Sequence, residues 1–274
     1  MNLFEKIVFL LQSEMKEPTP FGWFHCLCII VTLLTIIILF KKRKEYNEKQ
    51  LKTVLACYGI IALTLEILKQ ISWSFNYDAT NNLVKWSYEW YAAPFQLCTT
   101  PIYVSLICLF LKDNKIRKAL LSYLAFVTIL GSFFTIIIPE SCFVEDILVN
   151  IHTMWLHCGS FVVSIYLLIT NAVEIKKENY KLSIITFLVF VIIALIMNIT
   201  IYHSGILQNQ TFNMFYISPY FISSLPVFDA IQQNVPYILY LLIYIIALSL
   251  GALIVYFISY FIMSILEKIK KSGN

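Results

Sequence analysis

The chain has 274 residues, of which 59% are hydrophobic and only 13% are charged, and its formal net charge is +4. A soluble domain carries about 25% charged residues, so this composition excludes a soluble globular protein. Basic loops beside an anionic membrane surface account for the small positive charge, and no nucleic-acid partner is predicted.

The first 20 residues precede the first long apolar stretch. Apolar side chains recur there on one helical face: Leu3, Phe4, Ile7, Leu10 and Leu11. We therefore predict that residues 1–20 form an amphipathic segment on the outer membrane surface. This segment has no basic n-region and no small-residue cleavage site, so no signal peptide is predicted.

Seven apolar stretches are long enough to cross a bilayer, which takes about 20 residues. They cover residues 21–40, 53–75, 91–111, 118–138, 152–170, 181–203 and 236–263. The predicted fold is all-α, a polytopic transmembrane bundle of seven helices that occupies residues 21–263. Membrane lipids are therefore its expected partners. Six of the seven Cys residues fall within these stretches, and no disulfide framework is predicted.

Lys and Arg residues cluster in every second link between the stretches, and such clusters mark the cytoplasmic side. They lie in the first, third and fifth links and in the tail, at 41–52, 112–118, 176–181 and 268–271. The alternation predicts an outer N-terminus and an inner C-terminus. Residues 264–274 are then a basic cytoplasmic tail.

Glu66 and Lys69 lie inside the second stretch. A charge near the bilayer centre costs about 3 kcal/mol, and such residues usually face a protein interior and mark a site. The two residues are three apart, so they are neighbours on one helical face. They are predicted either to form a ligand site or to neutralise each other as a structural ion pair.

Most other polar residues of the spans fall in the outer half of the bilayer. Cys98 lies near the outer end of the third span, His152 at the mouth of the fifth, and His157 about a turn and a half deeper. His25 and Asn198 lie in the first and sixth spans. We expect one outer cavity lined by these groups, although His25 or Asn198 taken singly is also explained by a hydrogen bond across a helix interface.

Cys98 and His157 form the most reactive combination in this set. A thiol beside an imidazole can become a thiolate nucleophile with the His as base, although sequence alone does not place the two side by side. The His spacing lacks a zinc-ligand pattern and no carboxylate cluster joins it, so neither a metal nor a cofactor is predicted.

The last outer link, residues 204–235, contains no Lys or Arg and one acidic residue, Asp229. It is too apolar for a solvated loop, and Pro219 and Pro226 interrupt it. We predict a re-entrant or lid-like loop that folds back over the cavity. The alternative is an interfacial loop that packs on the bundle.

Several short segments, in chain order, carry a family resemblance: FGWFH at 21–25, PFQLC at 94–98, GSFF at 131–134, IHTMWLHCG at 151–159 and NMF at 213–215. Together with Glu66 and Lys69, they resemble the YwaF-type family of bacterial integral membrane proteins. Two positions depart from the family pattern. Gln96 stands where many relatives have His, and Cys158 separates His157 from the following Gly.

Animal relatives of that family include an acyltransferase that makes polyunsaturated ether phospholipids. The resemblance implies a seven-helix protein of a bacterial cell membrane, in which Cys98 takes an acyl group as a thioester and His157 acts as base. It also implies that Glu66 orients His157 or a headgroup amine and that Lys69 holds a phosphate. The further candidates for binding an acyl-lipid substrate are His25, Gln96, Asn198 and Asn213.

The expected function is therefore a membrane-embedded lipid acyltransferase or acyl hydrolase. If the family His at position 96 serves as base or ligand, its replacement by Gln96 alters or abolishes that activity. Two alternatives stay open. One is a transporter or small-molecule receptor in which Glu66 and Lys69 bind the ligand, and the other is a non-catalytic membrane scaffold.

Overall fold

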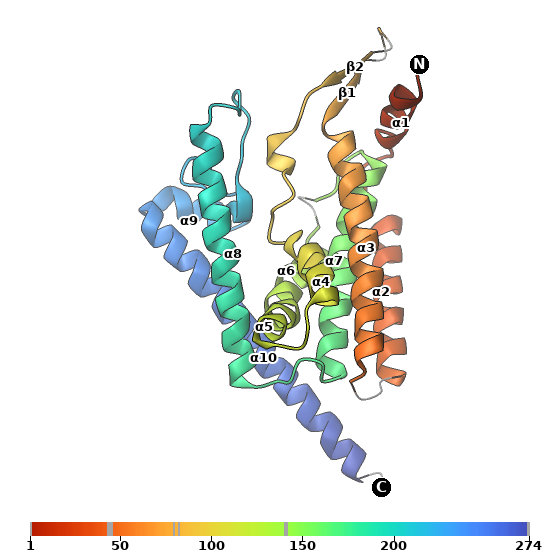
Figure 1. Cartoon of the computed structure of the whole chain (residues 1–274), viewed down its shortest axis with the longest axis vertical. Coiled ribbons are helices and arrows are strands. Elements are labelled where there is room, and N and C mark those ends of the chain that lie inside the picture. The colour runs from red at the N-terminus through yellow and green to blue at the C-terminus, as the bar shows by residue number, and fades with distance from the viewer. Residues whose placement is uncertain (1, 43–45, 79, 82, 140–141, 273–274) are drawn as a thin grey trace.

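A computed structural model describes residues 2–42, 46–78, 80–81, 83–139 and 142–272. These residues form an elongated helical bundle with α1 (Leu3–Leu11) and a small hairpin at one end and the end of the last helix at the other (Figure 1). Six helices of the described chain are long and apolar enough to cross a membrane: α2 (Trp23–Lys41), α3 (Glu48–Ser72), the continuous helix 115–137, α7 (Ile147–Ile169), α8 (Lys177–His203) and α10 (Tyr237–Ser272). The α-helical membrane fold is thus as predicted.

The predicted third span, 91–111, is the exception. It contains the 3₁₀ turn η1 (Trp90–Ala92), an irregular stretch, and the short helix α4 (Thr100–Phe110). Eleven residues of helix extend about 16 Å, too short for a hydrocarbon layer of about 30 Å. Pro94 explains the break, because it forces Ala93 into an extended conformation (φ −50°, ψ 138°). The predicted count of seven full-length helices is therefore not confirmed.

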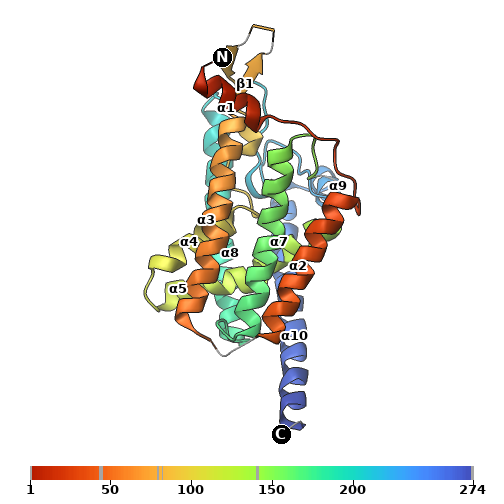
Figure 2. The same ribbon diagram turned by 90° about the vertical axis from the view of Figure 1, so that its right-hand side faces the viewer.

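At one end of the bundle, which we call the hairpin end, three segments distant in sequence pack together. Strands β1 (Phe75–Asp78) and β2 (Leu83–Trp86) form an antiparallel hairpin in which Phe75 pairs with Trp86. The Gln12 side chain, just after α1, donates to the carbonyl of Ser72 at 2.9 Å, and the Met15 amide donates to the carbonyl of Glu145 at 2.7 Å. Figure 2 shows α1 lying against this hairpin, above α3. The hairpin was not predicted.

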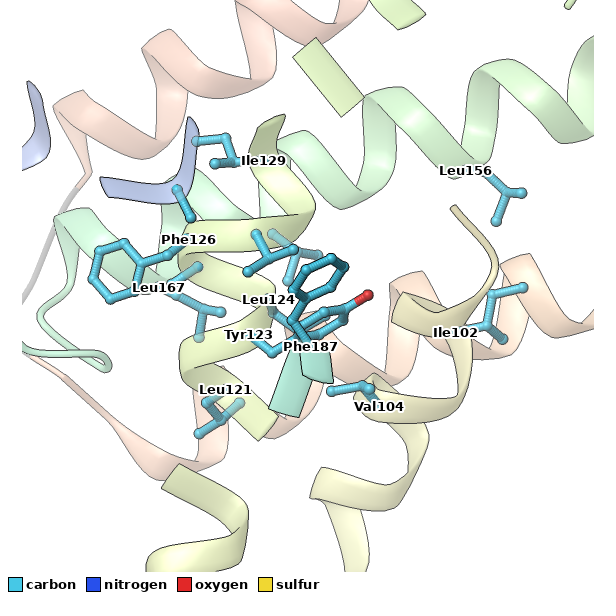
Figure 3. Close-up of a cluster of buried hydrophobic side chains, with 14 of the residues drawn as sticks. Ile102, Val104, Leu121, Tyr123, Leu124, Phe126, Ile129, Leu156, Leu167 and Phe187 are labelled. Carbon is cyan, nitrogen blue, oxygen red and sulfur yellow. The ribbon is translucent and has the colours of Figure 1, made fainter. Parts of the chain in front are cut away.

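The centre of the bundle is a continuous helix made of α5 (Lys115–Tyr123), the π-helix η2 (Leu124–Thr128) and α6 (Ile129–Ile137). All five residues of η2 are buried. They pack against α7 and α4 on one side and against α8 and α10 on the other. Figure 3 shows the apolar core around this helix, where Tyr123, Phe126, Leu167 and Phe187 converge.

The opposite end, which we call the basic end, joins the first and third links. The Arg117 guanidinium, 2% exposed, donates to both carboxylate oxygens of Glu48, at 3.1 Å and 2.8 Å. Asn47 and Asn114 cap the helices that begin here by accepting from the amides of Gln50 and Arg117. The basic links therefore meet at one end, as the alternation requires. Which end faces the cytoplasm stays a prediction.

The loop 204–235 is folded rather than extended. It contains the short helices η3 (Met214–Tyr216) and α9 (Phe228–Asn234). Phe212, Met214, Phe215 and Ile217 are 2% exposed or less, so this part of the loop enters the bundle. Of the predicted tail, 264–274, residues 264–272 continue α10 as helix and 273–274 lie outside the described residues; Figure 1 shows α10 projecting beyond the other helices.

Candidate functional site

The buried charges of α3 lie in one hydrogen-bonded group, which we call the Glu66 network: Glu66, Lys69, Gln70 and His152. Lys69 Nζ lies 2.8 Å from Glu66 Oε1, so the pairing predicted from their spacing is confirmed. His152 Nε2, from α7, lies 2.7 Å from the other carboxylate oxygen. Gln70 Nε2 donates to Glu66 Oε1 at 2.8 Å. Both carboxylate oxygens are therefore engaged within the protein.

The network is anchored to the irregular stretch that replaces the third span. Gln70 Nε2 donates to the Ala92 carbonyl at 2.7 Å, and Lys69 Nζ donates to the same oxygen at 3.4 Å. The Tyr88 hydroxyl donates to Gln70 Oε1 at 2.9 Å. Lys69 also lies 5.7 Å from the centroid of the Trp73 ring, a cation–π distance. The ammonium is thus neutralised on several sides although it is buried.

His152 is the partner of Glu66 that sequence reasoning missed. Glu66 was expected to orient His157, which lies on the same helix as His152, five residues further on. Glu66 lies six residues, about 9 Å, before the end of α3 at Ser72. At that height it meets the first turns of α7. The sequence did carry a clue to this contact, since it places His152 at the outer mouth of its span.

Cys98 lies beside this network, in the irregular stretch just before α4. Its side chain is partly exposed and within electrostatic range of Lys69 and Glu66. The side chain of the preceding residue, Leu97, lies next to Gly131 of α6. Within the described residues, the Cys98 thiol has no hydrogen-bond partner outside its own backbone.

His157, on α7, lies in the interior and is 8% exposed. It is three residues from Ser160, whose hydroxyl lies 2.6 Å from that of Ser132 on α6. In the described part of the chain its imidazole makes no hydrogen bond, with Cys98 or with another group.

Tyr58 of α3 lies near Cys98 and packs on α7, the helix that carries His157. Sequence reasoning missed this residue as well. Its hydroxyl is buried without a hydrogen-bond partner among the described residues, near Ser160 and within electrostatic range of Cys98. Its ring packs on Gly159, where an added Cβ would come within 2.8 Å of a ring carbon. An unpaired buried hydroxyl is costly. Tyr58 and Cys98 are thus within electrostatic range of each other, and the Tyr58 ring packs on the helix that carries His157.

The amides predicted to bind substrate make hydrogen bonds to the loop 204–235. Asn198 donates to the Met214 carbonyl at 3.0 Å and accepts from its amide at 2.7 Å. Gln96 donates to the Asn213 carbonyl at 2.9 Å and accepts from the Phe215 amide at 2.8 Å. We call these paired contacts the amide clamps. The Asn213 side chain in turn accepts from the Ser218 amide at 2.8 Å.

His25 is likewise engaged by main chain. Its Nδ1 accepts from the Phe21 amide at 2.9 Å, so the proton lies on Nε2, which donates to the Ile136 carbonyl at 2.8 Å. The residue is fully buried and joins α2 to the end of α6. This is the helix-interface role that its position also allowed. The described residues contain no group of three or more His, Cys, Asp or Glu side chains that could hold a metal.

Apolar helices of spanning length and a buried charged network define the class of this protein: it is a multi-pass integral membrane protein. The model of the TMEM164 family matches residues 20–261, nearly the whole chain, and the protein belongs to that family. No curated protein and no solved structure shows a significant match.

Proposed function

We propose that this protein is a membrane-embedded lipid acyltransferase or acyl hydrolase that uses Cys98 as nucleophile and His157 as base. The observation that carries the proposal is the contrast in hydrogen bonding. The network of Glu66, the amide clamps and His25 are internally satisfied, whereas Cys98 and His157 are without partners within the described residues. Reactive groups left unpaired in an interior are candidates for chemistry.

The proposed reaction has two half-steps. His157 takes the thiol proton, and the Cys98 sulfur attacks the carbonyl carbon of an acyl ester. The ester C–O bond breaks, the leaving alkoxide takes the proton from His157, and a thioester remains. In the second half-step a lysolipid hydroxyl or water loses its proton to His157 and attacks the thioester carbonyl carbon. The C–S bond breaks, and the Cys98 thiolate takes the proton back from His157. A lysolipid acceptor gives transfer, and water gives hydrolysis.

Tyr58 supplies a role that the resemblance did not suggest. In both half-steps negative charge develops on the carbonyl oxygen of the acyl group. A preorganised donor aimed at that oxygen stabilises the transition state. The Tyr58 hydroxyl, unpaired among the described residues and close to Cys98, is suited to this role. The network of Glu66 then acts as a rigid wall that positions Cys98.

The resemblance to the YwaF-type family supports the same proposal, as do its animal acyltransferase relatives. Cys98 lies in the segment similar to the family's Pro-x-His-Leu-Cys pattern, and a bacterial cell membrane is the corresponding location. The departure at Gln96 is consistent with the proposal, because the Gln96 side chain is occupied by the loop at residues 213–215. No step above requires a base at that position.

The test is acyl transfer by the purified protein in phosphatidylglycerol–phosphatidylcholine vesicles that carry an isotope-labelled acyl chain. Cys98→Ala should abolish both transfer and hydrolysis, and wild type should carry a hydroxylamine-sensitive acyl adduct on Cys98 by mass spectrometry. His157→Ala should lower the rate by about 10²- to 10⁴-fold, the usual contribution of a general base. The matched control is Cys57→Ala, because Cys57 lies exposed on α3. Full activity in Cys98→Ala would refute the proposal.

A non-catalytic scaffold is the second candidate. It is favoured because both carboxylate oxygens of Glu66 are already engaged within the Glu66 network. Buried ion pairs with complete hydrogen bonding also occur as purely structural links. This candidate expects no activity in wild type on any acyl donor, no adduct on Cys98, and unchanged folding in Cys98→Ala. The transporter alternative receives less support, since the Glu66 carboxylate and Lys69 ammonium are already paired to each other.

A further inference from the structure

A recess opens at the basic end of the bundle, away from Cys98. Its lining comes from the ends of three helices: Leu39 and Lys42 of α2, Lys49, Gln50, Thr53 and Val54 of α3, and Tyr166 and Thr170 at the end of α7. Its volume is about 480 Å³. We call it the inner recess. Cavities of about 300–1,000 Å³ hold small ligands.

The mouth of the inner recess is cationic. Lys42 and Lys49 are both exposed, and neither ammonium has an ion-pair partner among the described residues. The nearby carboxylate of Glu48 is occupied by Arg117 and Lys52. No acidic residue is among those that line the recess. The mouth is therefore built to receive negative charge.

The wall carries a hydroxyl donor. Tyr166 is only 5% exposed as a residue, and its hydroxyl has no hydrogen-bond partner within the described residues. Tyr166 lines the recess, and its hydroxyl is not among the fully enclosed unpartnered atoms, so a ligand there can accept from it. Leu39 and Val54 form the apolar part of the wall, beside the polar residues Gln50, Thr53 and Thr170.

We infer that the inner recess binds the phosphate of an anionic phospholipid from the leaflet at the basic end. Two ammonium groups and a phenol hydroxyl match a phosphate ester, and the apolar wall matches the start of an acyl chain. Basic pockets between transmembrane helices on the cytoplasmic side bind such headgroups. This site is independent of the proposed chemistry at Cys98, which lies nearer the hairpin end.

The test titrates short-chain phosphatidylglycerol into the full-length protein in neutral detergent and follows binding by microscale thermophoresis. Phosphatidylcholine and inorganic phosphate are titrated in parallel. Wild type should bind phosphatidylglycerol in preference to both. Lys42→Ala/Lys49→Ala should weaken binding about 30-fold, because each Lys near an anionic lipid contributes a factor of about five. Tyr166→Phe should weaken it about fivefold through the lost hydrogen bond.

The matched control is Lys112→Ala/Lys115→Ala, which removes the same charge from the same end, at exposed positions outside the recess. It should bind like wild type. Equal loss in this control, or no loss in Tyr166→Phe, would show general surface attraction and overturn the site. Tighter binding of inorganic phosphate than of the lipid would overturn the lipid assignment. If the double variant does not fold, Lys49→Ala alone gives the same comparison.

Discussion

At the scale of single residues, the buried charges of α3 are distinguished by the number of their hydrogen-bond and ion-pair partners. Glu66 and Lys69 are almost fully buried, and each has several partners. Their spacing on α3 made the ion pair predictable. Their relation to His152 was not, because it depends on how far α3 and α7 slide past each other. Sequence fixes periodicity along a helix far better than the relative height of two helices.

The first prediction concerns the balance of charge in this pair. Lys69→Met leaves the Glu66 carboxylate buried without its cation, and removing one partner of a buried pair costs about 3 kcal/mol. The double variant Glu66→Gln/Lys69→Met should lose less than the sum of the two single variants, because no orphaned charge remains. Thermal unfolding in detergent measures both. Lys85→Met, at the exposed hairpin, is the control and should unfold like wild type.

Additive losses in the double variant would mean that the ion pair carries no coupling. That outcome would leave His152 and Gln70 as the main partners of Glu66, and the pairing at 2.8 Å as a minor contribution.

At the scale of elements, the informative feature is the irregular chain between η1 and α4. Composition predicted a seventh full-length span there, since residues 91–111 are mostly apolar and carry no charge. Apolar composition alone did not predict that Pro94 and Pro101 confine the helix to eleven residues. The exposed backbone of such a segment is tolerated at membrane depth only inside protein. Here the loop 204–235 covers it, and Phe95 stacks on Phe215 at 5.7 Å.

The amide clamps keep this covering loop in place. Phe215, whose amide is held by Gln96, and the next residue, Tyr216, both adopt positive φ, 58° and 59°. Such conformations cost about 1–3 kcal/mol each and persist only when surrounding contacts impose them. Gln96 and Asn198 were predicted to bind substrate. Sequence could not distinguish that role from holding the loop, because an amide serves a ligand and a peptide group equally well.

The second prediction removes one clamp. Asn198→Leu leaves the amide and carbonyl of Met214 buried without partners, so the loop should loosen. Hydrogen exchange of peptides covering residues 212–217 should accelerate by about tenfold or more, since two hydrogen bonds are worth about 2 kcal/mol. Asn234→Leu, on the exposed side of α9, is the control. Unchanged exchange in Asn198→Leu would show that packing alone holds the loop.

On the scale of the whole molecule, the distribution of Lys and Arg predicted which links lie together. The contact of Glu48 with Arg117 at one end, and of Met15 with Glu145 at the other, agrees with that alternation. The count of Lys and Arg predicts which links share an end because the basic links, 41–52, 112–118 and 176–181, are hydrophilic and short. They carry no information on tilt or packing, which is why the central position of the helix 115–137 was not predicted.

The third prediction tests sidedness. In a Cys142→Ser background, Thr80→Cys at the hairpin end should react with a membrane-impermeant maleimide on intact cells. Asp113→Cys at the basic end should react only after permeabilisation. Both positions are exposed, and the remaining cysteines give the baseline. The reverse pattern would place the N-terminus inside and would move Cys98 to the other leaflet.

The π-helix η2 has a mechanical consequence. It packs against α7 and α4, which adjoin α3, and also against α8 and α10. The Ser164 hydroxyl donates to the Leu124 carbonyl at 2.6 Å, so the widened turn is tied to α7. A rocking of α8 and α10 relative to α3 and α7 would turn on these five residues as on a fulcrum. Since Asn198 of α8 holds Met214 of the loop, the same rocking would move residues 213–215 relative to Gln96.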